Sequence, residues 1–276
     1  MRINQNVMAN NAYRNLSTTN MSLGKSLEKL SSGFRINRAA DDAAGLVISQ
    51  GLRSQVSGLR QAARNAQDGI SVVQTAEGAL NEVHTILNRM RDLAVQSANT
   101  GSNDTAARTA AAAEITALTS EITRISDTTR FGGTNLLDGT YTAAVGVFQV
   151  GANGTADDQV TVAITNTDAA TLAVNALDVT TSAATAQAAI TSISAAISTV
   201  SAQRGSLGAL QNRFESMINN LQVTTENLVA SESRIRDTDM AVEMTNFTKN
   251  QILSQAGTAM LAQANQVPQS ILSLLR

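Results

Sequence analysis

The chain lacks several residue types on which compact globular proteins normally depend. Its 276 residues include no Cys, no Trp and one Pro, and only 3% are aromatic although 43% are hydrophobic. Without Cys, the protein has no disulfide framework and no cysteine metal site. With a single Pro, long stretches of the chain are free to form helices. The apolar residues are mostly Ala, Leu, Val and Ile, which predicts a mainly helical protein without an aromatic-rich core.

Charge is sparse and unevenly distributed. Residues 1–40 carry six basic residues and one acidic residue, whereas residues 250–276 carry only Arg276. The basic arm has no interleaved aromatic residues to stack on bases, which favours a solvated helix face over a nucleic-acid site. The uncharged C-terminal stretch contains five Gln residues, which do not belong in a bilayer. Residues 1–20 lack the apolar run of a signal peptide. We therefore expect neither nucleic acid nor membrane as a partner.

Three helices are predicted in the first half of the chain. The N-terminal helix spans residues 1–34, and its apolar residues recur at steps of three, four and seven: Leu16, Leu23, Leu27, Leu30 and Phe34. A second helix is predicted over about 42–99 and a third over about 105–128. At ~1.5 Å per residue the second would be roughly 85 Å long, which exceeds a single globular core and requires a bundle or coiled coil.

The second half contains the most regular pattern in the chain. One apolar position recurs every seven residues without a break: Ile193, Val200, Leu207, Phe214, Leu221, Leu228 and Ile235. Such a heptad repeat requires a partner helix along its length. A last helix over about 242–276 carries Leu253, Met260, Val267, Ile271 and Leu274 on a second apolar seam. Because the outer face of this helix is Gln, Ser, Asn and Ala instead of Lys and Glu, we expect other protein to surround it.

Residues 141–180 differ from the rest of the chain. Alternation at Val160, Val162 and Ile164 predicts a strand, and residues 145–150 predict another, so the segment is interpreted as a β-hairpin with a loose Thr-rich loop. The fold class is therefore mainly α: a long antiparallel helical bundle or coiled coil with terminal helices and a small β-hairpin insert. Three domains are predicted: a terminal coiled coil (1–41 with 237–276), a helical bundle (42–140 with 181–236) and the insert (141–180).

The terminal helices predict self-assembly. A single pair of helices cannot cover two apolar seams and an uncharged outer face, whereas lateral stacking of many copies can. A contact between unlike surfaces that does not close into a ring produces a helical filament. The apolar residues assigned to the core or to contacts between copies are Leu16, Leu23, Leu27, Leu30, Phe34, Leu253, Met260, Val267, Ile271 and Leu274.

Two long sequence strings resemble the signatures of bacterial flagellins. Leu-Ser-Ser-Gly-Phe-Arg-Ile-Asn-Arg-Ala-Ala-Asp-Asp-Ala-Ala-Gly-Leu, residues 30–46, resembles the N-terminal signature. Residues 233–241 and 262–270 resemble the C-terminal signature. The resemblance covers about 1–140 and 186–276. It implies a structural subunit of the extracellular flagellar filament, with the terminal helices forming its inner tube and the large outer domains of many relatives missing.

The resemblance also implies a route and a set of partners. Flagellins leave the bacterial cytoplasm unfolded through the flagellar type III apparatus, with a chaperone on the C-terminal helix, and assemble under a cap protein beyond the hook-junction proteins. Some flagellins are sensed by a vertebrate Toll-like receptor. Arg89, Leu93 and Glu114 match the family's receptor contacts, while Met90 and Asp92 depart from its pattern. Packing between subunits is the equally weighted alternative for these residues.

No catalytic, cofactor or metal site is predicted. His84 is the single His and, with no Cys, makes a zinc site or a catalytic triad improbable, so it is interpreted as a helix-surface or subunit-contact residue. Asp41 and Asp42 are interpreted as helix-capping residues because adjacent carboxylates diverge on a helix. The nearest alternative function is that of a hook–filament junction protein. A host-binding adhesin would need a larger outer domain than this chain has. An enzyme is the least favoured class.

Overall fold

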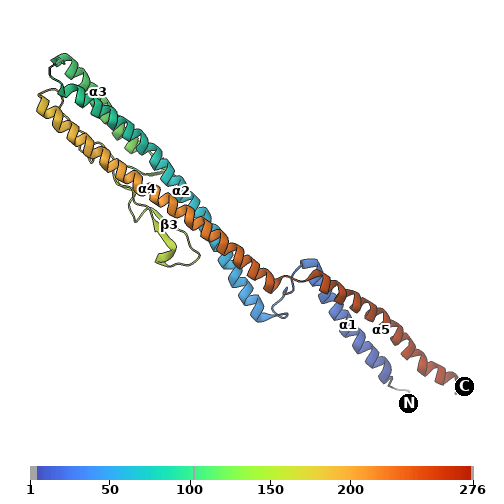
Figure 1. Cartoon of the computed structure of the whole chain (residues 1–276). Coiled ribbons are helices and arrows are strands. Elements are labelled where there is room, and N and C mark those ends of the chain that lie inside the picture. Colours follow the sequence, from blue (N-terminus) through green and yellow to red (C-terminus); the bar gives the residue numbers. More distant parts are fainter. Residues whose placement is uncertain (1–4, 102, 275–276) are drawn as a thin grey trace. The chain divides into compact units, whose positions relative to one another are not determined.

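The computed structural model describes residues 5–101 and 103–274, with side chains described through residue 266. The chain divides into two compact units: unit 1 comprises residues 1–54 and 226–276, and unit 2 comprises residues 55–225. Five helices account for most of the fold (Figure 1): α1 (Val7–Ser32), α2 (Ala43–Ala98), α3 (Thr105–Thr128), α4 (Ala183–Arg236) and α5 (Met240–Leu274). The mainly α fold class is confirmed, and the five predicted helices are all present.

Short polar side chains determine where the helices begin. Asn6 caps α1 by accepting a hydrogen bond from the Ala9 amide at 3.1 Å, and Asp104 caps α3 through the Ala107 amide at 2.8 Å. Asp42 accepts from the Gly45 amide at 2.9 Å, which confirms its predicted capping role at α2. Such caps satisfy backbone donors that have no partner within the helix. Gly33 ends α1 in the left-handed conformation, with φ of 75°.

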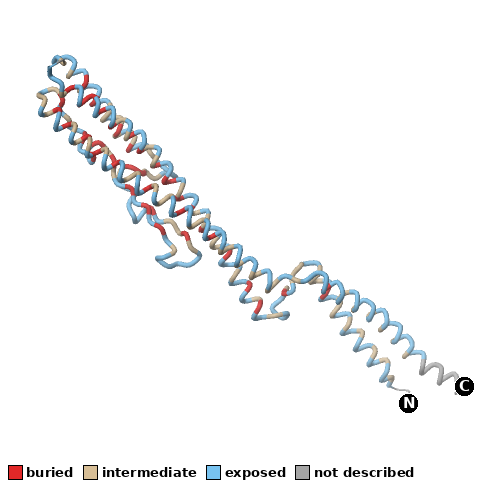
Figure 2. Tube along the Cα trace, in the orientation of Figure 1, coloured by how far each residue is buried: buried red, intermediate tan, exposed pale blue. Residues whose placement is uncertain are grey.

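Five of the seven predicted heptad positions of α4 are buried in unit 2, whereas Leu228 and Ile235 belong to unit 1 and are half-buried. Ile193, Val200, Leu207 and Phe214 are fully buried, and Leu221 is nearly so. The four fully buried residues belong to one continuous apolar cluster with buried residues of α2 and α3, which include Ala66, Val73, Leu80, Val83, Leu87, Met90, Ile115 and Ile122. Figure 2 shows these buried positions along the helices of unit 2. Within the described residues α4 alone has the length and composition of a membrane span, but its heptad residues are already buried in this core.

The β structure of unit 2 is shorter than predicted. Two antiparallel pairs are present: β1 (Arg130–Phe131) with β2 (Thr134–Asn135), and β3 (Val147–Gln149) with β4 (Gln159–Thr161), with Phe148 opposite Val160. A single-turn helix, η1 (Ala156–Asp158), precedes β4. Val162 and Ile164 are buried as expected but lie beyond β4, because their amides bond irregular backbone at Gly146 and Tyr141 instead of a strand partner.

The Thr-rich segment that follows is not a loose loop, so that expectation was wrong. Thr167, Val174 and Val179 are at most marginally exposed, and the Thr167 amide donates to the Leu137 carbonyl at 3.0 Å. Asp168 accepts from the Thr171 amide at 2.6 Å. Backbone and side-chain hydrogen bonds therefore hold an irregular segment on the core without regular secondary structure.

The hairpin is attached to the helices by one close aromatic contact. The rings of Phe148 and Phe214 meet edge to face, with centroids 5.7 Å apart and an interplanar angle of 82°. Gly69 on α2 makes room for Phe214, because a Cβ at this position would lie 2.8 Å from the Phe214 Cζ. The Asn65 side chain donates to the Gln149 carbonyl at 2.9 Å. Unit 2 therefore closes its own core with residues from its three helices, from β3 and β4, and from the irregular segments between them.

Unit 1 has almost no core of its own. Among the described residues its one buried hydrophobic side chain is Ile36, and its other buried side chains are the polar Ser26, Ser49 and Glu243. By contrast, fourteen of the nineteen large hydrophobic side chains that are exposed on the described chain belong to unit 1. A unit that buries so little apolar surface gains little stability from its own packing, so contacts with other copies would stabilise it further.

Candidate assembly surface

The two terminal helices pair antiparallel in unit 1, side by side in Figure 1. Near one end of the pair the Asn6 side chain donates to the Ala264 carbonyl at 2.7 Å. In the middle, Leu16 lies against Gly257, and the Ser254 hydroxyl donates to Asn20 at 2.9 Å. At the other end the Thr238 amide donates to the Gly33 carbonyl. Residue numbers rise along α1 as they fall along α5, which establishes the antiparallel register.

The contact between these helices consists mainly of small or polar residues. We define the α1–α5 seam by the less exposed positions that recur every three or four residues on the two helices. They are Ala9, Ala12, Leu16, Thr19, Leu23, Ser26 and Leu30 on α1, and Glu243, Phe247, Asn250, Ser254, Gly257, Leu261 and Ala264 on α5. Small residues allow the helices to approach closely, but they bury little apolar area and contribute correspondingly little stability.

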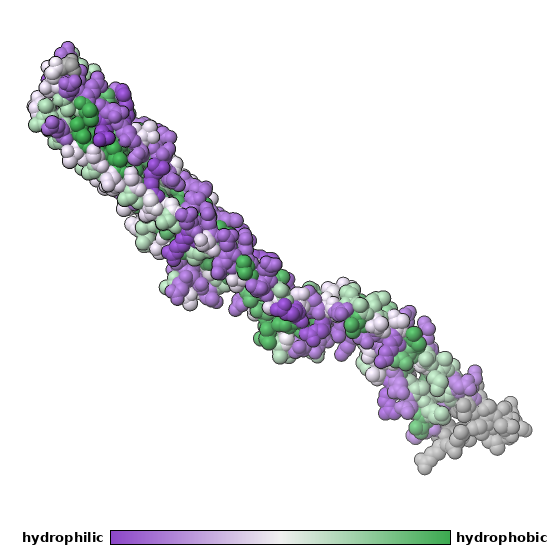
Figure 3. All heavy atoms as spheres, in the orientation of Figure 1, coloured by the Kyte–Doolittle hydropathy of each residue, from purple (hydrophilic) through white to green (hydrophobic). Residues whose placement is uncertain are grey.

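Larger apolar side chains point away from this seam. We define the outer apolar face by the exposed members of the terminal helices: Val7, Met8, Tyr13, Met21, Leu27, Met240, Val242, Met244, Ile252, Leu253 and Met260. Figure 3 shows apolar residues on the visible surface of both helices. Full burial of one such side chain against another molecule contributes about 1.5–3 kcal/mol to the free energy of association. An exposed apolar surface of this kind therefore marks an interaction site.

The apolar residues predicted for the core or for subunit contacts fall into three groups. Leu16, Leu23, Leu30 and Phe34 are half-buried within the single chain. Leu27, Leu253 and Met260 are 51%, 46% and 64% exposed, so they do not form an intramolecular core. The side chains of Val267, Ile271 and Leu274 lie outside the described residues. Helix α1 packs against Gly257 and Ser254 of α5, so Leu253 and Met260 lie outside this intramolecular contact, and contacts between copies remain the predicted role for them.

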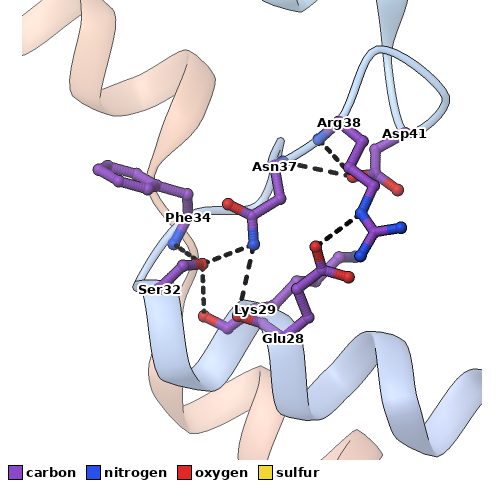
Figure 4. A network of polar contacts seen from close by, with 7 residues as sticks. All are labelled: Glu28, Lys29, Ser32, Phe34, Asn37, Arg38 and Asp41. Atoms are coloured by element: carbon purple, nitrogen blue, oxygen red, sulfur yellow. Dashed lines mark hydrogen bonds and ion pairs between the residues drawn. The ribbon is translucent and has the colours of Figure 1, made fainter.

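A network of polar contacts stabilises the turn between α1 and α2 (Figure 4). The Ser32 hydroxyl accepts from the Phe34 amide at 3.1 Å and from the Asn37 side chain at 2.8 Å. Asp41 accepts from the amides of Asn37 and Arg38 at 3.3 and 3.0 Å. Sequence reasoning assigned Asp41 to capping, and the structure shows instead that it closes this turn, one residue before the true cap.

Two further interactions concern the charged groups of this network. The backbone hydrogen bond from Arg38 is the main cause that lowers the pKa of Asp41, so its carboxylate is stabilised in the charged form. The Arg38 guanidinium also pairs with Glu28 at 2.8 Å. Both groups are solvent-accessible, and an exposed pair of this kind contributes at most ~1 kcal/mol. The turn therefore depends on backbone hydrogen bonds more than on the ion pair.

A short backbone bridge joins the ends of α1 and α4. Phe34 pairs antiparallel with Asp237, and the Arg35 amide donates to the Arg236 carbonyl at 2.7 Å. The Arg236 guanidinium lies over the Phe34 ring, 4.4 Å from its centroid. The predicted seam included Phe34 but missed this bridge, because an isolated pair of residues has no periodicity in the sequence. The bridge brings the starts of α5 and α2 close to the end of α1.

The candidate receptor contacts lie in unit 2. Arg89 on α2 and Glu114 on α3 form an ion pair at 2.7 Å and are both about half exposed. Leu93 is 4% exposed and belongs to the core cluster, so its side chain is not available to a receptor in this conformation. His84 is partly exposed on α2, as a surface or subunit-contact residue would be.

Known proteins match the chain along its whole length. Residues 3–142 match the bacterial flagellin N-terminal helical region, and residues 190–275 match the bacterial flagellin C-terminal helical region. The chain belongs to the bacterial flagellin family. A flagellin of Bacillus subtilis is 51% identical over 304 residues, and one of Halalkalibacterium halodurans is 52% identical over 279 residues. Both matches cover 100% of this chain and 100% of the relative.

A solved structure extends the comparison to the fold. A protein of Vibrio parahaemolyticus assigned as flagellar hook-associated matches with a TM-score of 0.58 and 17% identity, and covers 71% of this chain and 100% of that one. At this identity the likeness shows the fold alone, and it does not favour the hook-junction alternative. As a flagellin, the chain is a structural protein, and its candidate assembly surface is the outer apolar face of unit 1.

Proposed function

We propose that the outer apolar face is the surface through which this flagellin, a structural subunit of the bacterial flagellar filament, joins neighbouring subunits. One observation carries the proposal. Unit 1 buries a single hydrophobic side chain, Ile36, among its described residues, while both of its terminal helices expose large apolar residues. We propose further, as predicted from the sequence, that residues 1–41 and 237–276 make the contacts of the filament interior; these limits are narrower than those of unit 1.

The energetics favour many neighbours over one. If half of the eleven residues of the outer apolar face became covered, burial would contribute on the order of 10 kcal/mol before ordering costs are subtracted. Subunits related by a repeated non-closing contact can cover faces that point in different directions around the helix pair. The predicted contacts between copies include Leu27, Leu253 and Met260.

A matched pair of substitutions tests the proposal. Val242 on α5 is 56% exposed and Val145 in unit 2 is 54% exposed, so Val242→Glu and Val145→Glu introduce the same charge at equally exposed positions. An acid in the first turn of α5 favours the helix itself, so Val242→Glu leaves folding intact. We expect Val145→Glu to polymerise normally after salting out and Val242→Glu to form no filaments in electron micrographs. Filaments of normal length from Val242→Glu would refute the assigned surface.

The C-terminal helix also supports a proposal about export. We propose that the chain is secreted unfolded through the flagellar type III apparatus to an extracellular filament, with an export chaperone on residues 242–276 and with the cap and hook-junction proteins as later partners. The absence of Cys and the absence of charged residues between positions 250 and 275 are compatible with this route. A chain truncated after residue 241 should stay monomeric and lose chaperone binding in a pull-down. Retention of the chaperone by the truncated chain would contradict the assignment.

We propose recognition by a vertebrate Toll-like receptor at Arg89 and Glu114. These side chains are exposed and paired on unit 2, which is folded without its neighbours. Binding of the unassembled subunit to the receptor ectodomain should fall at least tenfold for Arg89→Ala. Arg124→Ala is the matched control, because Arg124 forms a similar exposed pair with Glu121 on α3. Equal binding by all three proteins would rule out this site.

A further inference from the structure

The methionines of the described chain are divided between the two units. Met8, Met21, Met240, Met244 and Met260 all lie on the terminal helices of unit 1, and each is between 47% and 66% exposed. They make up five of the eleven residues of the outer apolar face. Leu or Ile would supply a similar apolar area at these positions, so apolar contact alone does not require a thioether on the outer apolar face.

The methionines of unit 2 are less exposed than those of unit 1. Met90 is fully buried in the core cluster and Met217 is partly buried against it. The chain has no Cys to consume oxidants, so thioether sulfur is its most readily oxidised side-chain group. Exposure therefore makes the five methionines of unit 1 the first oxidation targets of an unassembled subunit.

The reaction needs only a peroxide. A sulfur lone pair attacks one oxygen of hydrogen peroxide, the O–O bond breaks, an S–O bond forms, and the remaining oxygen leaves as water. The sulfur loses two electrons and the peroxide gains them, which gives methionine sulfoxide. The product is polar and accepts hydrogen bonds, whereas the thioether is apolar and flexible.

We propose that these five methionines are a peroxide-sensitive modification site at which oxidation of the unassembled subunit blocks polymerisation. The inference rests on the proposed function, because it requires the outer apolar face to be covered in the filament. An interface that must bury a sulfoxide oxygen leaves that oxygen without a partner or must admit water, and either result weakens association.

The fold of the single chain should not respond to this oxidation. None of the five methionines belongs to the α1–α5 seam, and none belongs to the core cluster of unit 2. Oxidation should therefore weaken polymerisation without unfolding the single chain. It is also reversible, because methionine sulfoxide reductases return the sulfoxide to the thioether.

The experiment treats the full-length subunit with dilute hydrogen peroxide and measures the subunit concentration above which filaments form. We expect this concentration to rise about tenfold or more, since a polar group left unpaired at each contact weakens association by that order. Peptide mass spectrometry should find one added oxygen at each of the five methionines, with Met90 unchanged. The helical circular dichroism of the unassembled subunit should stay the same.

Two variants locate the effect. A chain with Leu at all five exposed positions should polymerise after peroxide treatment as it does before. A chain with Met90→Leu and Met217→Leu should remain as sensitive as the unmodified protein. Unchanged assembly of the unmodified subunit after oxidation at all five positions would overturn the inference. A loss of assembly that reductase treatment does not reverse would overturn it as well.

A separate arm distinguishes this failure from failure of the proposed function. In assembled filaments the five methionines should take up oxygen at least tenfold more slowly than in free subunits, because neighbours cover them. Equal rates in filaments and free subunits would show that the outer apolar face stays uncovered, which contradicts the proposed function itself. Slow oxidation in filaments together with peroxide-resistant assembly of free, oxidised subunits would contradict only the peroxide sensitivity.

Discussion

Gly257 of α5 faces Leu16 of α1 with no space for a larger side chain. A Cβ at Gly257 would lie 3.2 Å from the Leu16 Cδ1 and 3.6 Å from its Cβ. This contact lies in the middle of the α1–α5 seam, between Ser254 and Leu261 of α5. The close approach of these two residues therefore determines how near the terminal helices lie to one another.

Replacing Gly257 with Val should separate the terminal helices. The added branched side chain collides with Leu16, and overpacking of this kind costs about 1–3 kcal/mol. Amide hydrogen exchange of α1 and α5 in the unassembled subunit should become about tenfold faster, since local opening is that much easier. Gly24→Val is the matched control, because nothing lies within 4 Å of a Cβ at Gly24. Slow exchange in the Gly257 variant would contradict the assigned register.

A second pair of glycines on α2 should respond in opposite directions. A Cβ at Gly69 would lie 2.8 Å from the buried Phe214 ring, whereas a Cβ at Gly78 meets nothing within 4 Å. Gly69→Ala should lower the free energy of unfolding of unit 2 by about 1–3 kcal/mol through strain. Gly78→Ala should raise it by roughly 0.5–1 kcal/mol, because Ala is the better helix former. Urea unfolding followed by circular dichroism measures both, and effects of the same sign would be inconsistent with this packing.

The heptads of α4 illustrate what the sequence could predict. Ile193 to Phe214 at seven-residue intervals required a partner helix, and these residues are fully buried in the core of unit 2. This prediction succeeded because large apolar residues at a fixed period can be buried on only one face of a helix. Leu93 was harder, since its assignment as a receptor contact came from resemblance and not from the periodicity that places it in the core.

Helix α5 illustrates what the sequence could not predict. Leu253 and Met260 were chosen for the seam because they are large and apolar, yet α1 packs on Gly257 and Ser254. Because α5 has very few charged residues, more than one of its faces shows apolar residues at helical spacing. The face that packs on α1 contains several small residues, so the sequence pattern identifies it less clearly than the exposed face with larger side chains. The Thr-rich part of residues 141–180 was wrongly expected to be a loose loop for another reason. Its order comes from individual hydrogen bonds, such as that from the Thr167 amide to the Leu137 carbonyl, which have no periodicity in the sequence.

Acid should loosen the irregular segment of unit 2 through Asp168. The hydrogen bond that Asp168 accepts from the Thr171 amide lowers the pKa of its carboxyl in the folded protein. A depressed folded pKa means that this contribution to stability is complete above the unfolded value near 3.8 and is lost as the pH falls through the folded value. Thermal unfolding between pH 6 and pH 2 should therefore show a smaller acid-induced decrease for Asp168→Asn than for the unmodified chain, together with a lower melting temperature near neutral pH.

Asp157→Asn is the control for this pH experiment. Asp157 lies on η1 in the same unit and is exposed, so its substitution should leave the melting temperature near neutral pH unchanged. An acid response that is the same for Asp168→Asn and the unmodified chain would exclude Asp168 as a source of acid sensitivity.

The ring of Phe34 should control the backbone bridge between the ends of α1 and α4. The Arg236 guanidinium lies 4.4 Å from the ring centroid, and a cation over an aromatic face contributes about 0.5–2 kcal/mol depending on its exposure. The bridge consists of the Arg35 amide on the Arg236 carbonyl and the Thr238 amide on the Gly33 carbonyl. Because two hydrogen bonds are too few to persist without support, Phe34→Ala should speed the exchange of these two amides by about tenfold in the unassembled subunit. Phe34→Tyr keeps the ring face and should exchange slowly, as the unmodified chain does. If Phe34→Tyr and Phe34→Ala accelerated exchange equally, the contact between Arg236 and the ring face would not account for the effect, and the bridge would have to be held by the packing of the helix ends.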